Sequence, residues 1–218
     1  MGRGRHSGYD DQREMILVRA AELFARGGYP GTSMNQVAEA CGLSKATLYH
    51  YFRDKYELLV NIAEDHVTRL QGIVGDALAE EATPQGQMRA LVRRLVEEYA
   101  SAQHEHRVLT EDVKFLEPAD RERILGKERE VVAAFARVVA ALRPDLREAA
   151  MNKPLTMLLF GMVNWMFTWM KPEGELDYAA MGPIVADLFL GGIGEVKAPA
   201  LNAGTPSASP SSAAPARS

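Results

Sequence analysis

Residues 33–59 read SMNQVAEACGLSKATLYHYFRDKYELL, and this stretch decides the fold. Ser33 followed by Gln36 fits the capping box that opens a helix, in which each side chain bonds to the other residue's backbone. Gly42 lies where a helix ends, because glycine adopts the left-handed conformation there without strain. Ser44 can cap a second helix of about two turns. Two short helices joined by a tight, glycine-containing turn form a helix-turn-helix, whose second helix has the size of a major-groove reader.

The second helix of this motif has two faces. Leu48 and Phe52 are four residues apart and point into a small core, which leaves the polar side chains pointing outward. Lys45 and Lys55 each lie in the first turn of a helix, where a cation opposes the helix dipole unless a phosphate binds at the same end. The alternative is that both lysines are solvated surface charges. The residues predicted to contact DNA are Thr32, Ser33, Ser44, Lys45, Thr47, Tyr49, His50 and Lys55.

The same stretch resembles a known family. The residues that carry the resemblance are Gly28-Tyr29, Thr32-Ser33-Met34, Val37-Ala38, Cys41-Gly42-Leu43-Ser44-Lys45, Thr47-Leu48-Tyr49, Tyr51-Phe52, Lys55 and Leu58-Leu59. In this order they resemble the DNA-binding domain of TetR/AcrR-type regulators over residues 15–59. The departures are small: Ala46 stands where glycine is common, and Cys41 where alanine is common. The resemblance implies a homodimeric repressor that binds a palindromic operator in double-stranded DNA and is released by a small-molecule effector.

The chain as a whole predicts an all-α protein of about nine helices. We divide it into a disordered basic arm at 1–10, a helix-turn-helix DNA-binding domain at 11–55, a helical ligand-binding and dimerisation domain at 56–194, and a disordered tail at 195–218. The helix after Asp54 extends to about residue 80, roughly 40 Å, and joins the two domains. The arm could reach phosphates or the minor groove, but a basic tail without fixed contacts is the interpretation we favour.

The last two predicted helices are apolar on nearly every side. Residues 154–170, PLTMLLFGMVNWMFTWM, form a run that is short for a membrane span and is interrupted by polar residues, so we expect no contact with a membrane. A helix that is apolar all round is buried all round, and a second copy of the chain can supply the missing cover. With the helix at 178–193 this run predicts a four-helix dimer interface. The predicted interface residues are Phe167, Met170, Met181, Ile184 and Leu188.

Charge is distributed unevenly along the chain. Residues 1–55 carry eight lysines and arginines against six acids, whereas the remaining residues carry 17 against 23. A basic end and an acidic remainder suit a protein that presents one end to a polyanion. The single cysteine excludes an intramolecular disulfide, and the N-terminal sequence does not resemble a signal peptide, so we expect a cytoplasmic protein.

Motifs of enzymes are missing from the sequence. We find no G-x-S-x-G, no H-E-x-x-H, no glycine-rich phosphate loop and no cysteine and histidine set spaced for a metal. We therefore predict no catalytic residues, no cofactor and no metal site. A helical adaptor that binds only protein is the alternative class, but it leaves the pattern from Ser44 to Lys55 unexplained.

The effector-binding site is predicted from apolar and aromatic residues of the second domain. The C-terminal segments Phe160-Gly161-Met162-Val163-Asn164-Trp165 and Leu188-Phe189-Leu190-Gly191-Gly192 resemble regulators of acyl-CoA, phenylacetate and sterol-fragment catabolism, which sense CoA thioesters. Arg107, Lys114, Arg121 and Arg123 could then meet the CoA phosphates. The other interpretation is a hydrophobic, drug-like effector of an efflux regulator, with Glu111 and Asp112 as acids. Predicted ligand-binding residues are Arg107, Val108, Phe115, Phe135, Phe160, Asn164 and Trp165, although each could equally be core or dimer contact.

Overall fold

The computed structural model describes residues 3–146, 150–170 and 176–198, and the side chains of residues 3–7 and of Phe167 lie outside this description. Within it the protein is all-α, as predicted, with nine α-helices and no strand. None of these helices is long and apolar enough to cross a membrane. The helices are α1 (Arg3–Gly27), α2 (Met34–Ala40), α3 (Lys45–Tyr51), α4 (Lys55–Glu80), α5 (Pro84–Ser101), α6 (Gln103–Glu111), α7 (Pro118–Leu142), α8 (Asn152–Trp169) and α9 (Tyr178–Ile193).

The predicted helix boundaries in the helix-turn-helix are confirmed by their caps. The Ser33 Oγ accepts from the Gln36 backbone at 3.3 Å, and the Ser33 backbone donates to Gln36 Oε1 at 2.8 Å, which completes a capping box at α2. Gly42 has a φ of +63°, the left-handed conformation that lets the chain turn towards α3. Asp54 caps α4 through the backbone N–H of Glu57 at 2.8 Å.

The first helix begins earlier than the sequence predicts. Residues 3–10 were expected to be disordered, but α1 starts at Arg3. The expectation was wrong because it considered local composition alone. The ring of Tyr9 stacks on that of Tyr51 in α3 at 4.7 Å, a tertiary contact that secures this end of the helix. Of the predicted tail at 195–218, residues 199–218 lie outside the described part of the chain.

The buried side chains form two clusters. The N-terminal core contains Ile16, Leu17, Ala20, Ala21, Phe24, Met34, Val37, Ala38, Leu48, Phe52, Leu58, Leu59, Ile62, Ala63, Val67, Val108, Leu109, Leu116 and Ile124. The C-terminal core contains Leu70, Val74, Ala77, Met88, Ala90, Leu91, Val92, Leu95, Val96, Tyr99, Val131, Ala134, Phe135, Val138, Val139, Leu146, Leu155, Leu159, Phe160, Val163, Met166, Tyr178, Val185, Ala186, Phe189 and Ile193.

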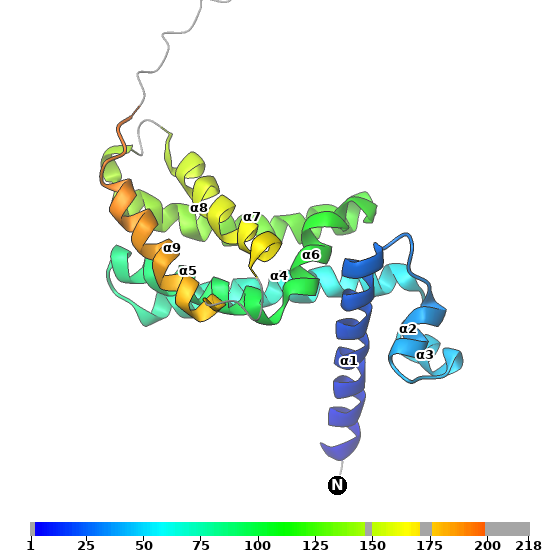
Figure 1. Cartoon of the computed structure of the whole chain (residues 1–218). Helices are drawn as coiled ribbons and strands as arrows, with labels where there is room; N and C mark the ends of the chain where they lie inside the picture. The colour runs from blue at the N-terminus through cyan, green and yellow to red at the C-terminus, as the bar shows by residue number, and fades with distance from the viewer. Residues whose placement is uncertain (1–2, 147–149, 171–175, 199–218) are drawn as a thin grey trace, which may run out of the picture.

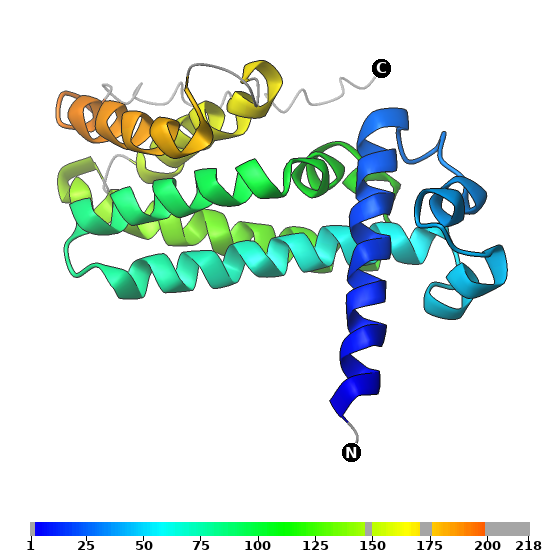
Figure 2. The same cartoon turned by 60° about the horizontal axis from the view of Figure 1, so that its bottom comes forward.

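Helix α4 connects the two cores. Its residues 58–67 face the N-terminal core, and its residues 70–77 face the C-terminal core. Figure 1 shows α4 running from the helix-turn-helix into the second domain, and the turned view in Figure 2 shows α1 crossing it near that end. Because its 26 residues form one unbroken helix, a displacement at one core is carried to the other.

Candidate DNA interface and effector domain

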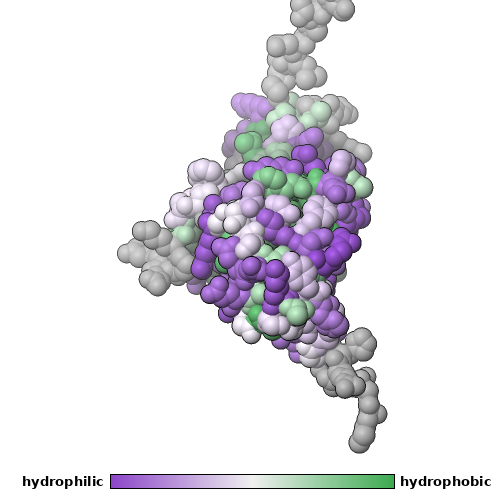
Figure 3. All heavy atoms as spheres, turned by 90° about the vertical axis from the view of Figure 1, so that its right-hand side faces the viewer, coloured by the Kyte–Doolittle hydropathy of each residue, from purple (hydrophilic) through white to green (hydrophobic). Residues whose placement is uncertain are grey.

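The outward face of α3 is polar and exposed. Leu48 and Phe52 are fully buried, as predicted, while Lys45, Thr47 and His50 are exposed and Tyr49 is 43% exposed. The ammonium group of Lys45 lies 5.9 Å from the centre of the Tyr49 ring. Figure 3 shows that the end of the molecule formed by the helix-turn-helix is mostly hydrophilic. This face can donate hydrogen bonds to phosphates and to base edges.

Ser44 fixes where α3 begins. Its Oγ accepts from the backbone N–H of Thr47 at 3.1 Å and lies 2.8 Å from the Thr47 hydroxyl. Ser33 occupies the same position at α2 and is exposed. Both serines therefore stand at helix N-termini, where unpaired backbone N–H groups attract anions.

Thr32 does not belong to this face. Its side chain is only 5% exposed, and its hydroxyl donates to the backbone oxygen of Gly28 at 3.0 Å. The hydroxyl thus closes the loop between α1 and α2 and is turned away from solvent. We drop Thr32 from the predicted DNA contacts, because a buried threonine in a family motif can equally be structural.

Lys55 has an internal role that its place in the sequence does not indicate. Its ammonium group donates to the backbone oxygens of Tyr29 and Pro30 at 2.8 and 3.3 Å, and lies 4.4 Å from the centre of the Tyr29 ring. It therefore ties the first turn of α4 to the α1–α2 loop. A lysine has three donors, so one N–H is left for a phosphate.

The first turn of α4 is also fastened to the second domain. The Tyr56 hydroxyl donates to Asp120 Oδ2 at 2.7 Å and accepts from the Glu117 backbone N–H at 2.9 Å. These bonds join α4 to the start of α7. Nearby, the rings of Tyr29 and Phe115 lie 5.5 Å apart. The helix-turn-helix is thereby bound to the turn between α6 and α7.

A buried pair of histidines lies between α4 and α6. His66 Nε2 and His106 Nδ1 are 3.3 Å apart, and the ring of Tyr99 packs on that of His106 at 3.9 Å. Burial, assisted by the nearby charges of His106 and Arg69, lowers the pKa of His66 to about 3. Burial lowers the pKa of His106 to about 4. Both rings are therefore neutral at pH 7, and one donates to the other.

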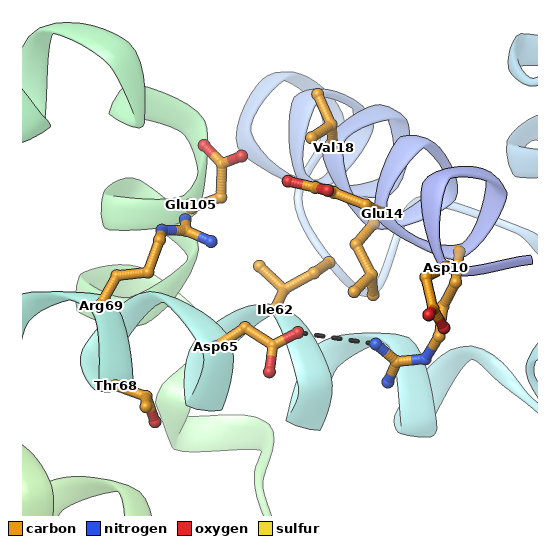
Figure 4. Close-up of a pocket in the computed structure, with 10 residues that line it drawn as sticks. Asp10, Glu14, Val18, Ile62, Asp65, Thr68, Arg69 and Glu105 are labelled. Atoms are coloured by element: carbon orange, nitrogen blue, oxygen red, sulfur yellow. Dashed lines mark ion pairs between the residues drawn. The ribbon is translucent and has the colours of Figure 1, made fainter. Parts of the chain in front are cut away.

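A cleft of about 490 Å³ opens between α1, α4 and α6 (Figure 4). Its floor is apolar, with Leu17 and Ile62, and its rim is charged. Arg13 of α1 lines the cleft, and its guanidinium lies 3.8 Å from the carboxylate of Asp65 of α4, the ion pair drawn as a dashed line in Figure 4. The guanidinium also lies 5.2 Å from the centre of the Phe52 ring. Arg13 therefore links α1 both to α4 and to the end of α3.

The predicted ligand-binding residues do not form one site. Val108 is buried in the N-terminal core, and Phe115 packs against Tyr29 at the domain junction. Arg107 lies on the surface in an ion pair with Glu111 at 3.0 Å. Val108 and Phe115 therefore do not lie in the C-terminal core that contains Phe135 and Phe160, and a role of these three residues in ligand binding stays a prediction. Apolar spacing along a helix identifies a buried face, but it does not identify which of two cores that face enters.

Phe135 and Phe160 do come together in the second domain, and Asn164 follows Phe160 on α8. The rings of Phe135 and Phe160 lie 4.9 Å apart within the C-terminal core. Asn164 is one helical turn from Phe160, and its Oδ1 is buried without a hydrogen-bond partner in the described structure. A buried amide oxygen without a donor is costly, so a donor supplied by a ligand would be stabilised there.

Trp165 lies on an exposed apolar face instead of in a cavity. It is 66% exposed, and Leu188 on α9 is 64% exposed. Of the other predicted interface residues, Ile184 is exposed, Met170 and Met181 pack partly on the C-terminal core, and the Phe167 side chain lies outside the described structure. The exposed face of α8 and α9 consists of Met157, Leu158, Trp165, Trp169, Ile184 and Leu188.

Leu158 and Trp169 belong to this face but were not among the predicted interface residues. Leu158, Trp165 and Trp169 are spaced by seven and four residues, which is the repeat of one helical face. That spacing was available from the sequence. It was hidden because the neighbouring positions of α8 are apolar as well.

Family models match most of the chain. A model described as bacterial regulatory proteins, tetR family, matches residues 16–62, and one described as tetracyclin repressor-like, C-terminal domain, matches residues 81–193. A TetR-family transcriptional regulator from Bordetella parapertussis 12822 is similar in structure, with a TM-score of 0.78, 34% identity and coverage of 82% of this chain and 93% of that one.

Two further relatives carry more specific names. The transcriptional activator FasR from Mycolicibacterium smegmatis is 29% identical over 53% of each chain, so the match spans about half of FasR. A solved structure of AibR in complex with isovaleryl coenzyme A and operator DNA is 25% identical, with a TM-score of 0.68 and coverage of 83% of this chain and 96% of AibR. With the helix-turn-helix and the helical second domain both matched, the chain belongs to the TetR family of transcriptional regulators and is not an enzyme.

Proposed function

We propose that the protein is a homodimeric repressor that binds a palindromic operator and is released by an acyl-CoA or aryl-CoA thioester. The observation that carries the proposal is the exposed polar face of α3, which the Ser44 cap and a closed apolar core hold in place. The proposed DNA contacts are Ser33, Ser44, Lys45, Thr47, Tyr49, His50 and the remaining N–H of Lys55.

The dimer is supported by the exposed face of α8 and α9. Apolar side chains gathered on two neighbouring helices are typical of a surface that binds protein. A twofold axis through this face would place four helices together and present two copies of α3. Two recognition helices read half-sites about 34–36 Å apart, so a dimer of fixed geometry selects a palindrome of fixed spacing.

The effector class is supported by the likeness to AibR, which was solved in complex with isovaleryl coenzyme A and operator DNA. In this chain an acyl group would lie beside Phe135 and Phe160, with Asn164 accepting a hydrogen bond. Arg107 is held in an exposed ion pair with Glu111, and such a pair contributes little, so a CoA phosphate could replace that carboxylate. Arg123 pairs with both Asp120 of α7 and Glu64 of α4, so a phosphate there would have to displace one of two carboxylates.

Release requires the effector to bind the DNA-incompetent arrangement better than the competent one. The Tyr56 bonds to Asp120 and Glu117 give a route for that preference. A shift of α7 on binding would move the first turn of α4 and, with it, α3. A change of a few ångströms in the separation of the two α3 helices prevents both from docking at once.

The test is a fluorescence-anisotropy titration on DNA from upstream of the protein's own coding region, at fixed salt, with a panel of acyl-CoA and phenylacetyl-CoA thioesters. We expect nanomolar binding to one palindrome that one thioester abolishes. Asn164→Leu should keep operator affinity and need at least tenfold more thioester. Asn152→Leu removes the other amide oxygen of α8 that is buried and unpaired in the described structure, but at the end of the helix away from Asn164, and should respond as the wild type.

Other outcomes would change the proposal in defined ways. Specific binding that no thioester alters would remove the thioester class and direct the search to hydrophobic, drug-like compounds. Tighter binding with a thioester would contradict release, and FasR, named as an activator, shows that regulators of this kind need not repress. No sequence-specific binding, there or on a genomic library, would overturn the repressor.

A further inference from the structure

The N-terminal part of α1 touches the recognition helix through one aromatic ring. Tyr9 stacks on Tyr51, with ring centres 4.7 Å apart and planes inclined by 26°. The same ring meets His50 edge to face at 6.4 Å. His50 and Tyr51 also lie edge to face, at 5.7 Å. Three aromatic rings from α1 and the last turn of α3 thus form one cluster.

Arg13 supports this cluster from the next turn of α1. Its guanidinium lies over the ring of Phe52, the residue that ends α3. It also donates to Asn61 of α4. Two successive turns of α1 therefore contact the last turn and the end of α3. In both views α1 projects beyond the helix-turn-helix at its N-terminal end (Figures 1 and 2).

The recognition helix needs support at this point. It has only seven residues, and a helix of that length is not stable by itself. Leu48 and Phe52 anchor its inner side, but Tyr51 packs only partly on the N-terminal core and His50 lies outside it. The imidazole of His50 faces solvent, where it would sample several rotamers without a neighbour.

Tyr9 is placed to restrict that freedom and to do little else. It is 40% exposed and is absent from both cores, so its removal opens no cavity. We propose that Tyr9 is a positioning residue for DNA recognition, which holds Tyr51 and orients His50 towards the groove that α3 reads. The inference rests on the proposed function, because it assumes that α3 reads DNA.

The cost of losing the ring follows from the strength of aromatic pairs. One aromatic pair changes a binding constant by about threefold to tenfold. In a dimer, Tyr9→Ala removes one such pair at each of the two half-sites. Operator binding should therefore weaken roughly tenfold to a hundredfold. Tyr9 makes this contribution without touching a phosphate, so the dependence of log K on log salt should keep its slope.

The experiment compares Tyr9→Ala, Tyr9→Phe and wild type on operator and on random DNA at several salt concentrations. Alanine is a good helix former, so α1 is retained. We expect Tyr9→Ala to lose operator affinity as stated, to change random-DNA affinity by less than threefold, and to keep its melting temperature within about 2 °C. Tyr9→Phe should restore operator binding, since the ring remains. Val18→Ala, which trims an equally exposed side chain on the same helix, should have no effect.

A second measurement reads the contact itself. The ring protons of His50 should shift in the proton NMR spectrum of Tyr9→Ala, because the neighbouring ring current is lost, and should return in Tyr9→Phe. Wild-type operator affinity in Tyr9→Ala would overturn the inference while the proposed function stands. The inference would also be overturned if Tyr9→Ala lost the same affinity for operator and for random DNA and reduced the slope of log K against log salt by about one. That result would indicate that Tyr9 contacts a phosphate. Failure of the wild type to bind any specific DNA would overturn the proposed function and this inference together.

Discussion

The two cores of the molecule differ in how completely they are covered. The N-terminal core is enclosed by α1 to α4, α6 and the start of α7 apart from the cleft above Leu17 and Ile62, and the face of this end seen in Figure 3 is mostly hydrophilic. The C-terminal core has α8 and α9 on its outer side, and these helices expose tryptophan and leucine side chains. The single chain provides the cover of the N-terminal core, whereas the outer side of the C-terminal core has an exposed apolar surface that a second copy of the chain could cover. The difference separates the region proposed to bind DNA from the region proposed to bind a second copy of the chain.

The largest expected effect tests whether these are two cores or one. Phe52→Ala and Phe135→Ala each remove a fully buried ring, and each should lower the free energy of unfolding by about 3–5 kcal/mol. Hydrogen exchange should show that Phe52→Ala exposes amides of α2 and α3 while those of α5 and α9 stay protected. The reverse should hold for Phe135→Ala. Uniform loss of protection in both variants would mean that the chain opens as one unit.

The next prediction concerns the uncovered face. Trp165→Glu places a charge in the proposed interface and should raise the dimer dissociation constant at least a hundredfold, as measured by sedimentation equilibrium. The monomer should keep its helical circular dichroism, since Trp165 supports neither core. Val18→Glu makes the same change at an exposed apolar residue over the N-terminal core and should leave the dimer intact. A wild type that is monomeric at micromolar concentration would refute the comparison.

Acidification should lower the stability of the fold through His66 and His106, the buried pair between α4 and α6. The folded pKa values of His66 and His106, about 3 and about 4, lie below the usual 6.5, so the unfolded chain binds more protons on acidification. The stability they contribute is complete above pH 6.5 and is lost as the pH falls. Between pH 7 and pH 5 each should cost about 2 kcal/mol. Thermal unfolding measures this, and a variant with both residues changed to glutamine should lose most of the pH dependence.

The smallest expected effect comes from removing a helix N-cap, and it compares the cap of α3 at the proposed DNA face with the cap of α5 elsewhere. Ser44→Ala and Thr83→Ala each remove a side chain that accepts from a helix backbone N–H, at 3.1 Å in both cases. Each should lower stability by about 1 kcal/mol in chemical denaturation. Only Ser44→Ala should also weaken operator binding. Equal operator affinities for the two variants would show that the start of α3 is held by its core residues alone.

Much of the fold could be predicted because its signals are local. The capping serines, Gly42 and the spacing of Leu48 and Phe52 act within a few residues of each other, and these predictions agree with the structure. The exposure of the polar face of α3 likewise depends only on which face of one helix is apolar. For these features, the spacing of residues along the chain directly determines which side chains lie on the same side of the helix.

The remaining errors concern contacts between distant segments. The early start of α1 depends on Tyr9 meeting Tyr51, and the burial of Thr32 depends on Gly28 folding back onto it. Val108 enters the N-terminal core because α6 crosses α1 and α4. Nothing in the local sequence distinguishes that core from the other. The exposure of Trp165 could not be predicted for a related reason. Because α8 is apolar on nearly every side, its sequence does not indicate which side remains exposed to solvent.

The placement of Val108 and Leu109 has a consequence for protein engineering. The residues proposed to read DNA are contiguous in sequence, so a hybrid regulator is naturally designed by cutting after residue 55 or at the end of α4. Either cut removes Val108, Leu109, Leu116 and Ile124 from the core under the helix-turn-helix. The transplanted piece would then depend on whether the new sensor domain happens to fill that space. A graft that carries residues 8–124 keeps the N-terminal core whole, but its α4 and α5 also bring residues of the C-terminal core that the new sensor domain must cover. Where that cover is supplied, such hybrids should retain the operator preference of the donor.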